Sequence, residues 1–320
     1  MPDKTPDIHE GPHAGKRLTR EDVERLIAER GASTGLDLRS ADLGQEILTG
    51  LDLRGVNFQG ANLQKTNLIE ANLSSCRLQG ALMQGASLQG AIVEGAQLAR
   101  AHLEGANLER AMLRAAQFQE ADLQQVKLGS ADLTDANLQR ADLRNADLPK
   151  ASLARSDLTN AWLGNANLQD VALENANLQN ARLAYSRLQG AIMWRANLQG
   201  ANLSNTNLAK AHLEGASLQS ADLEWAQLHG VRLYGAHLDY ETDLANGDWG
   251  DYVLGEELAG EFEQAEAVYR MLKEWHRQHG HYDIASEFAY RENEARRKAR
   301  WKRVKQLWHE LWQPAETSAG

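Results

Sequence analysis

Three histidines near the C-terminus form the densest group of metal-ligating side chains in the sequence. His276, His279 and His281 lie around Gly280, and imidazole nitrogens are common zinc ligands. The group has no cysteine or carboxylate support at the usual spacing, and histidine spacing alone is a weak signal. We therefore interpret the three side chains as exposed residues around a turn between two helices, and we predict no metal site.

Catalytic signatures are also missing from the sequence. It contains no Gly-rich phosphate-binding loop, no HExxH motif and no G-x-S-x-G nucleophile motif. We therefore predict no catalytic residues and no cofactor, and we interpret the protein as a non-enzyme. Its 34 Lys and Arg against 44 Asp and Glu give a net charge of −10, which disfavours nucleic acid as a general partner.

A cationic segment near the C-terminus has the clearest binding chemistry. From Arg291 to Lys305 there are eight Lys or Arg against two Glu, and apolar residues recur on one helical face. A cationic helix with a Trp-rich side suits an anionic membrane surface. The same pattern also serves a partner helix, nucleic acid, or pairing with the acidic stretch 239–269. The residues of this candidate membrane or partner helix are Arg296, Arg297, Arg300, Trp301, Arg303, Val304, Trp308, Leu311 and Trp312.

One sequence repeat predicts the structure of most of the chain that carries these residues. An apolar residue occupies every fifth position from Leu38 to Leu238, which makes 41 consecutive pentads, and 36 of these residues are leucine. Two positions earlier lies a small residue, alanine in 29 of the 41, and Asn or Asp often comes between them. Cys76 occupies one of the small positions, so we interpret it as a buried substitute for alanine rather than a nucleophile.

A period of five fits neither the 3.6-residue helix nor the two-residue strand. A chain that turns a corner every five residues can keep all of these leucines on one side. Four pentads close a square coil of about 20 residues, and coils stacked about 4.8 Å apart bury each leucine against the next. Such a narrow lumen has no room for bulky rings, which explains why aromatic residues make up only 6% of the chain.

The A(D/N)LXX pattern, as in Ala61-Asn62-Leu63, resembles the pentapeptide-repeat family. The resemblance covers about residues 36–240. It implies a mainly β fold, a right-handed quadrilateral parallel β-helix of about ten coils and roughly 50 Å in length. Leu36, Glu46 and Leu51 occupy positions where alanine is expected, so we expect the first coil or two to be irregular.

Both ends of such a solenoid need caps, because they expose backbone edges and an apolar cross-section. Thr19 predicts a helix N-cap with Asp22 as its acidic partner, and Gly31 predicts the end of that helix. After Leu238 the five-residue register breaks. The predicted organisation is a disordered tail (1–18), a capping helix (19–35), the β-helix (36–240), an acidic linker (241–255), an α-helical hairpin (256–312) and a disordered tail (313–320).

The predicted hairpin resembles one tetratricopeptide helix pair, with Tyr269, Leu272, Gly280, Tyr282 and Ala285 at matching places. A single pair cannot bury its own apolar face, so we expect it to pack on the last coil or on a second copy as a homodimer. The combination of repeat, acidic linker and helical tail resembles bacterial and archaeal pentapeptide-repeat proteins whose tails often lead into membrane helices. The resemblance implies a soluble relative or the soluble part of a membrane- or channel-associated protein.

Aromatic residues occupy outward positions in the second half of the repeat. Tyr185 and Trp225 hold the same slot two coils apart, as do Trp194 and Tyr234, and Trp162 shares the face of the first pair. Exposed aromatic side chains are enriched at protein interfaces. We interpret the five as a candidate interaction surface or, with equal weight, as residues covered by the C-terminal helices folding back.

These patterns favour a non-enzymatic scaffold that presents flat faces and a helical module to an unidentified protein partner. The sequence has one cysteine, no run of about 18 apolar residues and no apolar leader segment, which predicts a cytoplasmic location. Peripheral docking at the inner face of the membrane, through the last helix, is a further prediction.

A DNA-mimicking role is an alternative that the family resemblance implies, because some pentapeptide-repeat proteins bind gyrase-type topoisomerases in this way. Duplex DNA carries one charge per about 1.7 Å, so a 50 Å length holds roughly 29 negative charges. Residues 36–238 contain 20 Asp and Glu against 17 Lys and Arg, a net charge of −3. The sequence therefore disfavours this alternative.

Overall fold

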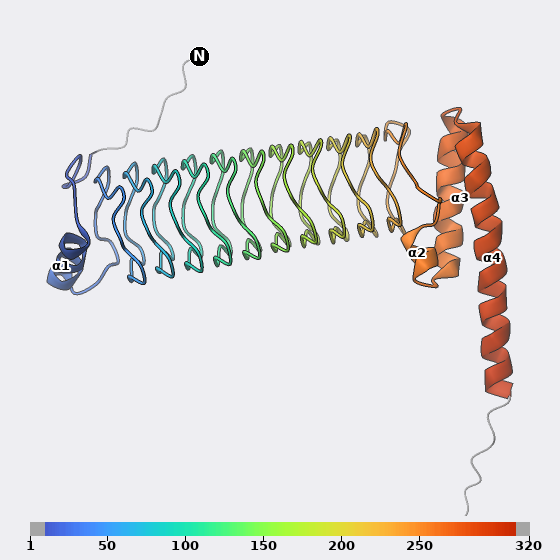
Figure 1. Cartoon of the computed structure of the whole chain (residues 1–320), viewed down its shortest axis with the longest axis horizontal. Coiled ribbons are helices and arrows are strands. Elements are labelled where there is room, and N and C mark those ends of the chain that lie inside the picture. Colours follow the sequence, from blue (N-terminus) through green and yellow to red (C-terminus); the bar gives the residue numbers. More distant parts are fainter. Residues whose placement is uncertain (1–9, 312–320) are drawn as a thin grey trace, which may run out of the picture.

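A stack of square coils makes up most of the protein (Figure 1). The structure is a computed structural model that describes residues 10–311. Isolated parallel β-bridges join residues 20 positions apart without interruption, from Asp37 with Asn57 to Ser217 with His237. Ten coils of four pentads therefore lie between Asp37 and His237, as the sequence predicts, and at about 4.8 Å per coil they form a rod roughly 50 Å long.

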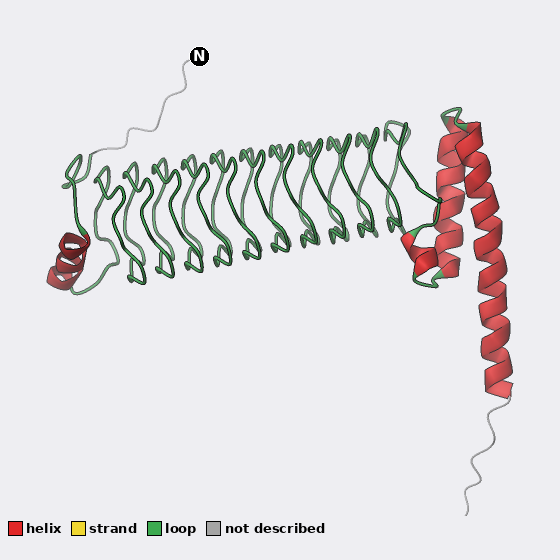
Figure 2. Cartoon of the chain, in the orientation of Figure 1, coloured by secondary structure: helices red, strands yellow, loops and turns green. Residues whose placement is uncertain are grey.

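Each side of a coil pairs with the next coil through single-residue bridges, so Figure 2 draws the coils as loops. The Leu138 amide donates to the Asp157 carbonyl at 2.7 Å, and the Asp157 amide donates to the Ala136 carbonyl at 2.9 Å. Two residues of every pentad form a turn, so too few residues remain on each side for a longer ladder of β-bridges. The expected parallel pairing is present, and it consists of isolated bridges.

The lumen contains the side chains that the repeat places inside it. The central leucines and the small residues two positions earlier are almost all fully buried. Burying one leucine contributes about 2 kcal/mol, and this contribution recurs on every side of every coil. Polar residues at the small positions donate to backbone carbonyls, either of the preceding coil, as Thr66 does to Leu43 at 2.8 Å, or of their own coil, as Ser156 does to Leu153 at 2.7 Å.

The corners explain why Asn and Asp precede the central leucine so often. Their side-chain oxygen accepts a hydrogen bond from the amide two residues later, as Asn62 does from Gln64 at 3.1 Å. The last residue of each pentad adopts a left-handed backbone, which favours Gly and Asn. The corner is therefore stabilised by residues of the pentad itself, in addition to the backbone bonds and side-chain packing that join it to neighbouring coils.

The N-terminal end is capped by α1 (Arg20–Arg30), which lies beside the first coil (Figure 1). As predicted, the Thr19 side chain accepts from the Asp22 amide, the Asp22 carboxylate accepts from the Thr19 amide, and Gly31 ends the helix in a left-handed conformation. Val23 is the fully buried residue of this helix.

Two expectations about this end are wrong. Residues 10–18 of the predicted disordered tail are ordered, because Arg17 bridges Asp42 and extends the stack, while residues 1–9 lie outside the described residues. The first coils also keep the regular 20-residue register. Glu46 is accommodated there because it stays partly exposed and forms a 3.6 Å ion pair with Arg17.

The C-terminal boundary of the solenoid lies further along the chain than expected. Asp243 bridges Asp222 and Asp248 bridges Gln227, so pairing continues through most of the predicted linker 241–255. The separation is 21 residues instead of 20, which reflects one inserted residue. The sequence register breaks at this insertion, but backbone pairing tolerates it and the coil still closes.

Three helices cross the end of the solenoid: α2 (Gly255–Leu258), α3 (Phe262–Gln278) and α4 (Tyr282–Leu311). The first predicted helix is thus divided, because Gly260 adopts a left-handed backbone between α2 and α3. The α3 and α4 helices form the expected hairpin, and the C-terminal half of α4 extends past the other two (Figure 1). Residues 312–320 of the predicted hairpin and tail lie outside the described residues.

Candidate interaction surfaces

The five outward aromatic residues lie on two opposite faces of the C-terminal half of the solenoid. All are exposed, and Tyr185 and Trp225 are the most open, with 62% and 56% of their surface accessible. The helices pack across the end of the rod and do not fold back along it (Figure 1). The interpretation that these helices cover the aromatic residues is therefore wrong, because the first residues after the solenoid turn onto its cross-section.

Trp162 is held between two cations from the neighbouring coils. The guanidinium groups of Arg144 and Arg182 each lie 4.9 Å from the centre of its ring. Arg182 occupies the position of Trp162 one coil later, and Arg144 lies two residues after Asp142, which holds that position one coil earlier. Such contacts orient the indole on the outside of the rod.

Tyr185 and Trp225 occupy the strained position of their pentads. Their φ angles are +62° and +59°, in the left-handed region that L-residues populate at a cost. Trp194 lies on the opposite face at an ordinary position, where its ring meets the edge of His212 at 6.1 Å between centroids. No requirement of the solenoid explains aromatic side chains at these corners.

The first half of α4 is fixed by ion pairs to the acidic stretch that precedes it. Arg296 contacts Glu266 at 2.9 Å and Glu292 at 2.8 Å, and Lys298 pairs with Glu257. Arg297 forms a 2.7 Å ion pair with Glu294, which also belongs to α4. Intramolecular pairing, one of the alternatives for the cationic segment, therefore accounts for its first part.

The second half of α4 has little such support, since Lys302 donates to the Gly260 carbonyl at 2.9 Å but forms no ion pair among the described residues. Residues 301–310 are all exposed, including Trp301 and Trp308, each with 62% of its surface accessible, and Val304. Within residues 10–311, Arg300 and Arg303 form no ion pair. Leu311 is the last helical residue, its side chain is not described, and Trp312 lies outside the described residues.

The three C-terminal histidines do not form one exposed group. His276 is fully buried beside Trp249 and Phe288, and burial, together with the nearby His281 and His279, lowers its pKa to about 3. The His279 ring stacks on Trp275, and the His276 and His281 Nδ1 atoms lie 3.3 Å apart. The interpretation as exposed turn residues is wrong for His276, because α3 presses that side of the turn onto the last coil.

Cys76 is buried, as predicted, in the lumen. Its thiol donates to the Leu53 carbonyl at 2.9 Å, and burial raises its pKa to about 12. A thiol with this environment remains protonated at neutral pH and is shielded from reagents.

Two acidic residues that hold the C-terminal cap were not identified from the sequence. The buried Glu256 carboxylate accepts from the amides of Leu233 and Tyr234 at 2.6 and 2.7 Å, which closes the open edge of the last coil. Glu257 accepts from the Tyr269 hydroxyl at 2.5 Å. Both glutamates lie at the start of the predicted hairpin, and their roles could not be read from the sequence because the partners of Glu257 are 12 and 41 residues away in the chain.

Hollows on the described surface are shallow and lie beside α4. One of about 320 Å³ lies between Phe262 and Lys302, and another of about 520 Å³ is lined by Trp301, Val304 and neighbouring cations. Neither brings a nucleophile together with a base. Among residues 10–311, no helix is long and apolar enough to cross a membrane.

The parallel 20-residue coils, the lumen of leucine and alanine and the two capped ends define a repeat solenoid. The family profile described as Pentapeptide repeats matches in eight copies between residues 34 and 235. The chain belongs to the pentapeptide-repeat family, whose members fold as right-handed quadrilateral β-helices and are generally non-enzymatic scaffold or interaction proteins.

Solved structures include similar solenoids. HetL, a pentapeptide repeat protein involved in heterocyst differentiation regulation from the cyanobacterium Nostoc sp. strain PCC 7120, is 33% identical with a TM-score of 0.66. The match covers 69% of this chain and 97% of HetL. QnrB1, a plasmid-mediated fluoroquinolone resistance protein, is 24% identical with a TM-score of 0.40, over 60% of this chain and 91% of QnrB1. No curated protein matches the sequence.

Proposed function

We propose that this protein is a non-enzymatic scaffold that binds a protein partner through its outward aromatic side chains. The observation that carries the proposal is the exposure of all five aromatic residues beside a helical module that leaves them uncovered. Trp and Tyr supply large contact areas at interfaces with little loss of side-chain entropy. Two of the five, Tyr185 and Trp225, are also kept at backbone positions that disfavour them.

The test is a double substitution, Trp194→Ser with Trp225→Ser, in the full chain. Proteins captured from the native cells would be quantified by mass spectrometry for the wild type, this variant and a control. Ile47→Ser with Met112→Ser is the matched control, because both residues are exposed and apolar but lie in the N-terminal half. We expect at least a 10-fold loss of the specific partner for the first variant alone. A large loss of thermal stability with unchanged capture would contradict the proposal.

We further propose that the free half of α4 docks the scaffold on an anionic membrane surface, at the inner face of the membrane in the cytoplasm. The supporting observation is that Trp301, Val304 and Trp308 form an exposed stripe while Arg300 and Arg303 have no ion-pair partner within residues 10–311. Apolar burial and attraction to acidic headgroups act together in such helices.

Co-sedimentation with vesicles tests this docking. We expect binding to phosphatidylglycerol-containing vesicles that weakens with salt, and much less binding to pure phosphatidylcholine. Trp301→Ser with Trp308→Ser removes the binding, whereas Tyr290→Ser, an exposed aromatic on the packed half of α4, leaves it intact. Failure to bind at low salt would end this proposal. Concentration-dependent dimerisation that the same tryptophan variant abolishes would instead favour a homodimer through α4.

The described surface gives no support to a DNA-mimicking role. Several of the acidic groups on the solenoid are neutralised by neighbours, such as Asp135 by Arg155 at 2.7 Å and Glu120 by Arg100 at 2.8 Å. A supercoiling assay with gyrase, with and without the protein, provides the direct test, and inhibition at micromolar concentration would revive this alternative.

A further inference from the structure

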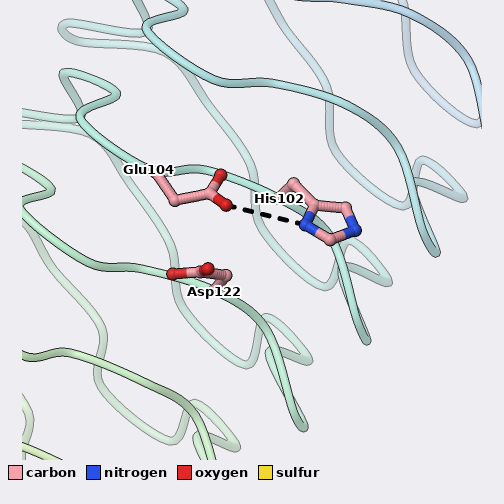
Figure 3. A group of neighbouring side chains, drawn as sticks. All are labelled: His102, Glu104 and Asp122. Atoms are coloured by element: carbon pink, nitrogen blue, oxygen red, sulfur yellow. Dashed lines mark ion pairs between the residues drawn. The ribbon is translucent and has the colours of Figure 1, made fainter.

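Three neighbouring side chains on the outside of the solenoid are of types that bind metal ions, and they take no part in the packing of the lumen. His102 and Glu104 flank the inward Leu103, so both point outward (Figure 3). Asp122 follows 20 residues later and bridges His102 across the parallel pairing. One ligand atom from each of the three side chains lies within 4.8 Å of the other two. Two consecutive coils thus bring an imidazole and two carboxylates together.

The charges in this group are poorly balanced. The Glu104 and Asp122 carboxylates are neighbours, and the His102 Nδ1 atom lies 3.7 Å from Glu104 Oε1. Glu104 Oε2 is shielded from solvent and has no hydrogen-bond partner among the described residues. Arg144 in the following coil interacts with the charge of Asp122, but it is also held by Asp142 at 2.5 Å and by the ring of Trp162. This cation is therefore shared with other partners and is not dedicated to the two carboxylates.

The protein contains its own comparison for this group. The hexapeptide Ala-His-Leu-Glu-Gly-Ala occurs at 101–106 and again at 211–216, at the same position within the pentad but on the opposite side of the solenoid. In the second copy the residue one coil later is Arg232, whose Nε lies 2.7 Å from Glu214 Oε1. The same local sequence thus meets a guanidinium at one place and a carboxylate, Asp122, at the other.

We propose that His102, Glu104 and Asp122 bind one divalent transition-metal ion of the zinc class. Imidazole with two carboxylates suits Zn²⁺, Co²⁺ or Ni²⁺ better than Mg²⁺ or Ca²⁺, which take oxygen ligands. Donor atoms on one zinc ion lie about 3.3 Å apart, given bonds of about 2.0–2.2 Å. The side chains are partly exposed, so rotations of His102 and Glu104 close the remaining distance.

The arrangement of the ligands limits what the ion does. All three approach from the face of the rod, so the outward coordination positions remain open to water or to a ligand from a partner protein. The ion also joins two successive coils, because Asp122 belongs to the coil after His102. Binding therefore stabilises the middle of the solenoid, and more so at higher metal concentration.

Isothermal titration with Zn²⁺ on the tag-free, chelator-treated full chain tests the proposal. We expect one equivalent bound with a micromolar dissociation constant. His102→Ala and Asp122→Asn each weaken this binding at least 10-fold, and Asp122→Arg, which copies the arrangement at Arg232, abolishes it. His212→Ala, in the second copy of the hexapeptide, is the matched control and leaves binding unchanged. Circular dichroism and thermal melting confirm that each variant is folded.

A second measurement separates this group from other histidines of the chain. Co²⁺ should give a visible absorption spectrum of a nitrogen and oxygen site that Zn²⁺ displaces and that His102→Ala removes. The variant His279→Ala with His281→Ala should bind normally. The proposal is overturned if the bound equivalent survives both His102→Ala and Asp122→Asn, if His279→Ala with His281→Ala removes it, or if no metal binds at millimolar Zn²⁺.

Discussion

The solenoid and its C-terminal helical module achieve burial in opposite ways. In the solenoid the same leucine and alanine recur on every side, and charged groups stay outside. In the module, charged and titratable groups are buried: Glu256, Glu257, His276 and Glu292 all have less than a tenth of their surface exposed. A repeated pattern therefore specifies the body, whereas a few individual contacts specify how the module attaches to it.

The contrast has a physical origin in the pairing requirement. Each inner coil satisfies its backbone with the coils on both sides, but the last coil has no following neighbour. Glu256 supplies acceptors for that open edge, and burial, opposed by hydrogen bonds from the backbone, raises the pKa of its carboxyl above the usual range. Polar contacts are thus concentrated where the repeat ends.

The largest effect is expected from removing a lumen side chain. Leu138→Ala leaves a cavity in a middle coil and should lower the free energy of unfolding by about 3 kcal/mol. Leu272→Ala, equally buried in α3, should cost a similar amount but open only the helical module. Urea unfolding measures the loss, and hydrogen exchange locates it. Loss of amide protection throughout the chain in both variants would contradict the division between body and module.

The second prediction concerns the closing carboxylate. Glu256→Ala leaves the amides of Leu233 and Tyr234 without an acceptor and should cost about 2 kcal/mol. Glu256→Gln keeps an acceptor oxygen and should lose much less. Hydrogen exchange of these two amides should rise in the alanine variant alone. Equal protection in both variants would show that another group closes the last coil.

The third prediction uses pH to destabilise the module selectively. His276 has a pKa of about 3 in the folded state against an ordinary 6.5, so the unfolded state binds the extra proton as pH falls. The contribution of neutral His276 to the free energy of unfolding is fully present above pH 6.5, and it decreases by about 2 kcal/mol between pH 8 and pH 5. His276→Leu should reduce this pH dependence, as measured by urea unfolding followed through tryptophan fluorescence. An unchanged pH profile in that variant would contradict the assignment.

The smallest effect has the opposite sign. Trp225→Gly and Tyr185→Gly place glycine at left-handed corners and should each raise the free energy of unfolding by about 1 kcal/mol. Trp194→Gly is the control, because Trp194 has an ordinary backbone and glycine there costs about 0.5–1 kcal/mol. Thermal melting of the three variants gives the comparison. If glycine lowered stability at all three positions, the corners would not be strained.

The sequence predicted the body well because its information is local and repeated. Residues such as Ala136 and Leu138 show their inward direction by spacing alone, and four pentads per coil follow from closure. The ends were predicted less well. Arg17 and Asp243 extend the stack outside the repeat pattern, since backbone pairing does not require leucine at every rung.

The candidate surfaces divide in the same way. The outward direction of Trp162 and Trp225 follows from the register, so sequence alone could identify them as candidates. Whether the helices cover them depends on the direction in which the chain leaves the last coil after Asp248, and no local pattern encodes that direction. The burial of His276 was missed for the same reason, because its neighbours Trp249 and Phe288 come from segments on either side of α3.

By itself the sequence determined a square coil of 20 residues, its lumen and its ten-coil length, because a strict five-residue period permits few other arrangements. Only the tertiary structure decided which charges become paired. The 20-residue register already places Asp122 and Arg232 one coil after the two histidines, but only the structure shows that Glu256 closes the last coil and that one half of α4 is bound and the other exposed. These outcomes depend on contacts between distant residues, whose energies no repeat pattern specifies.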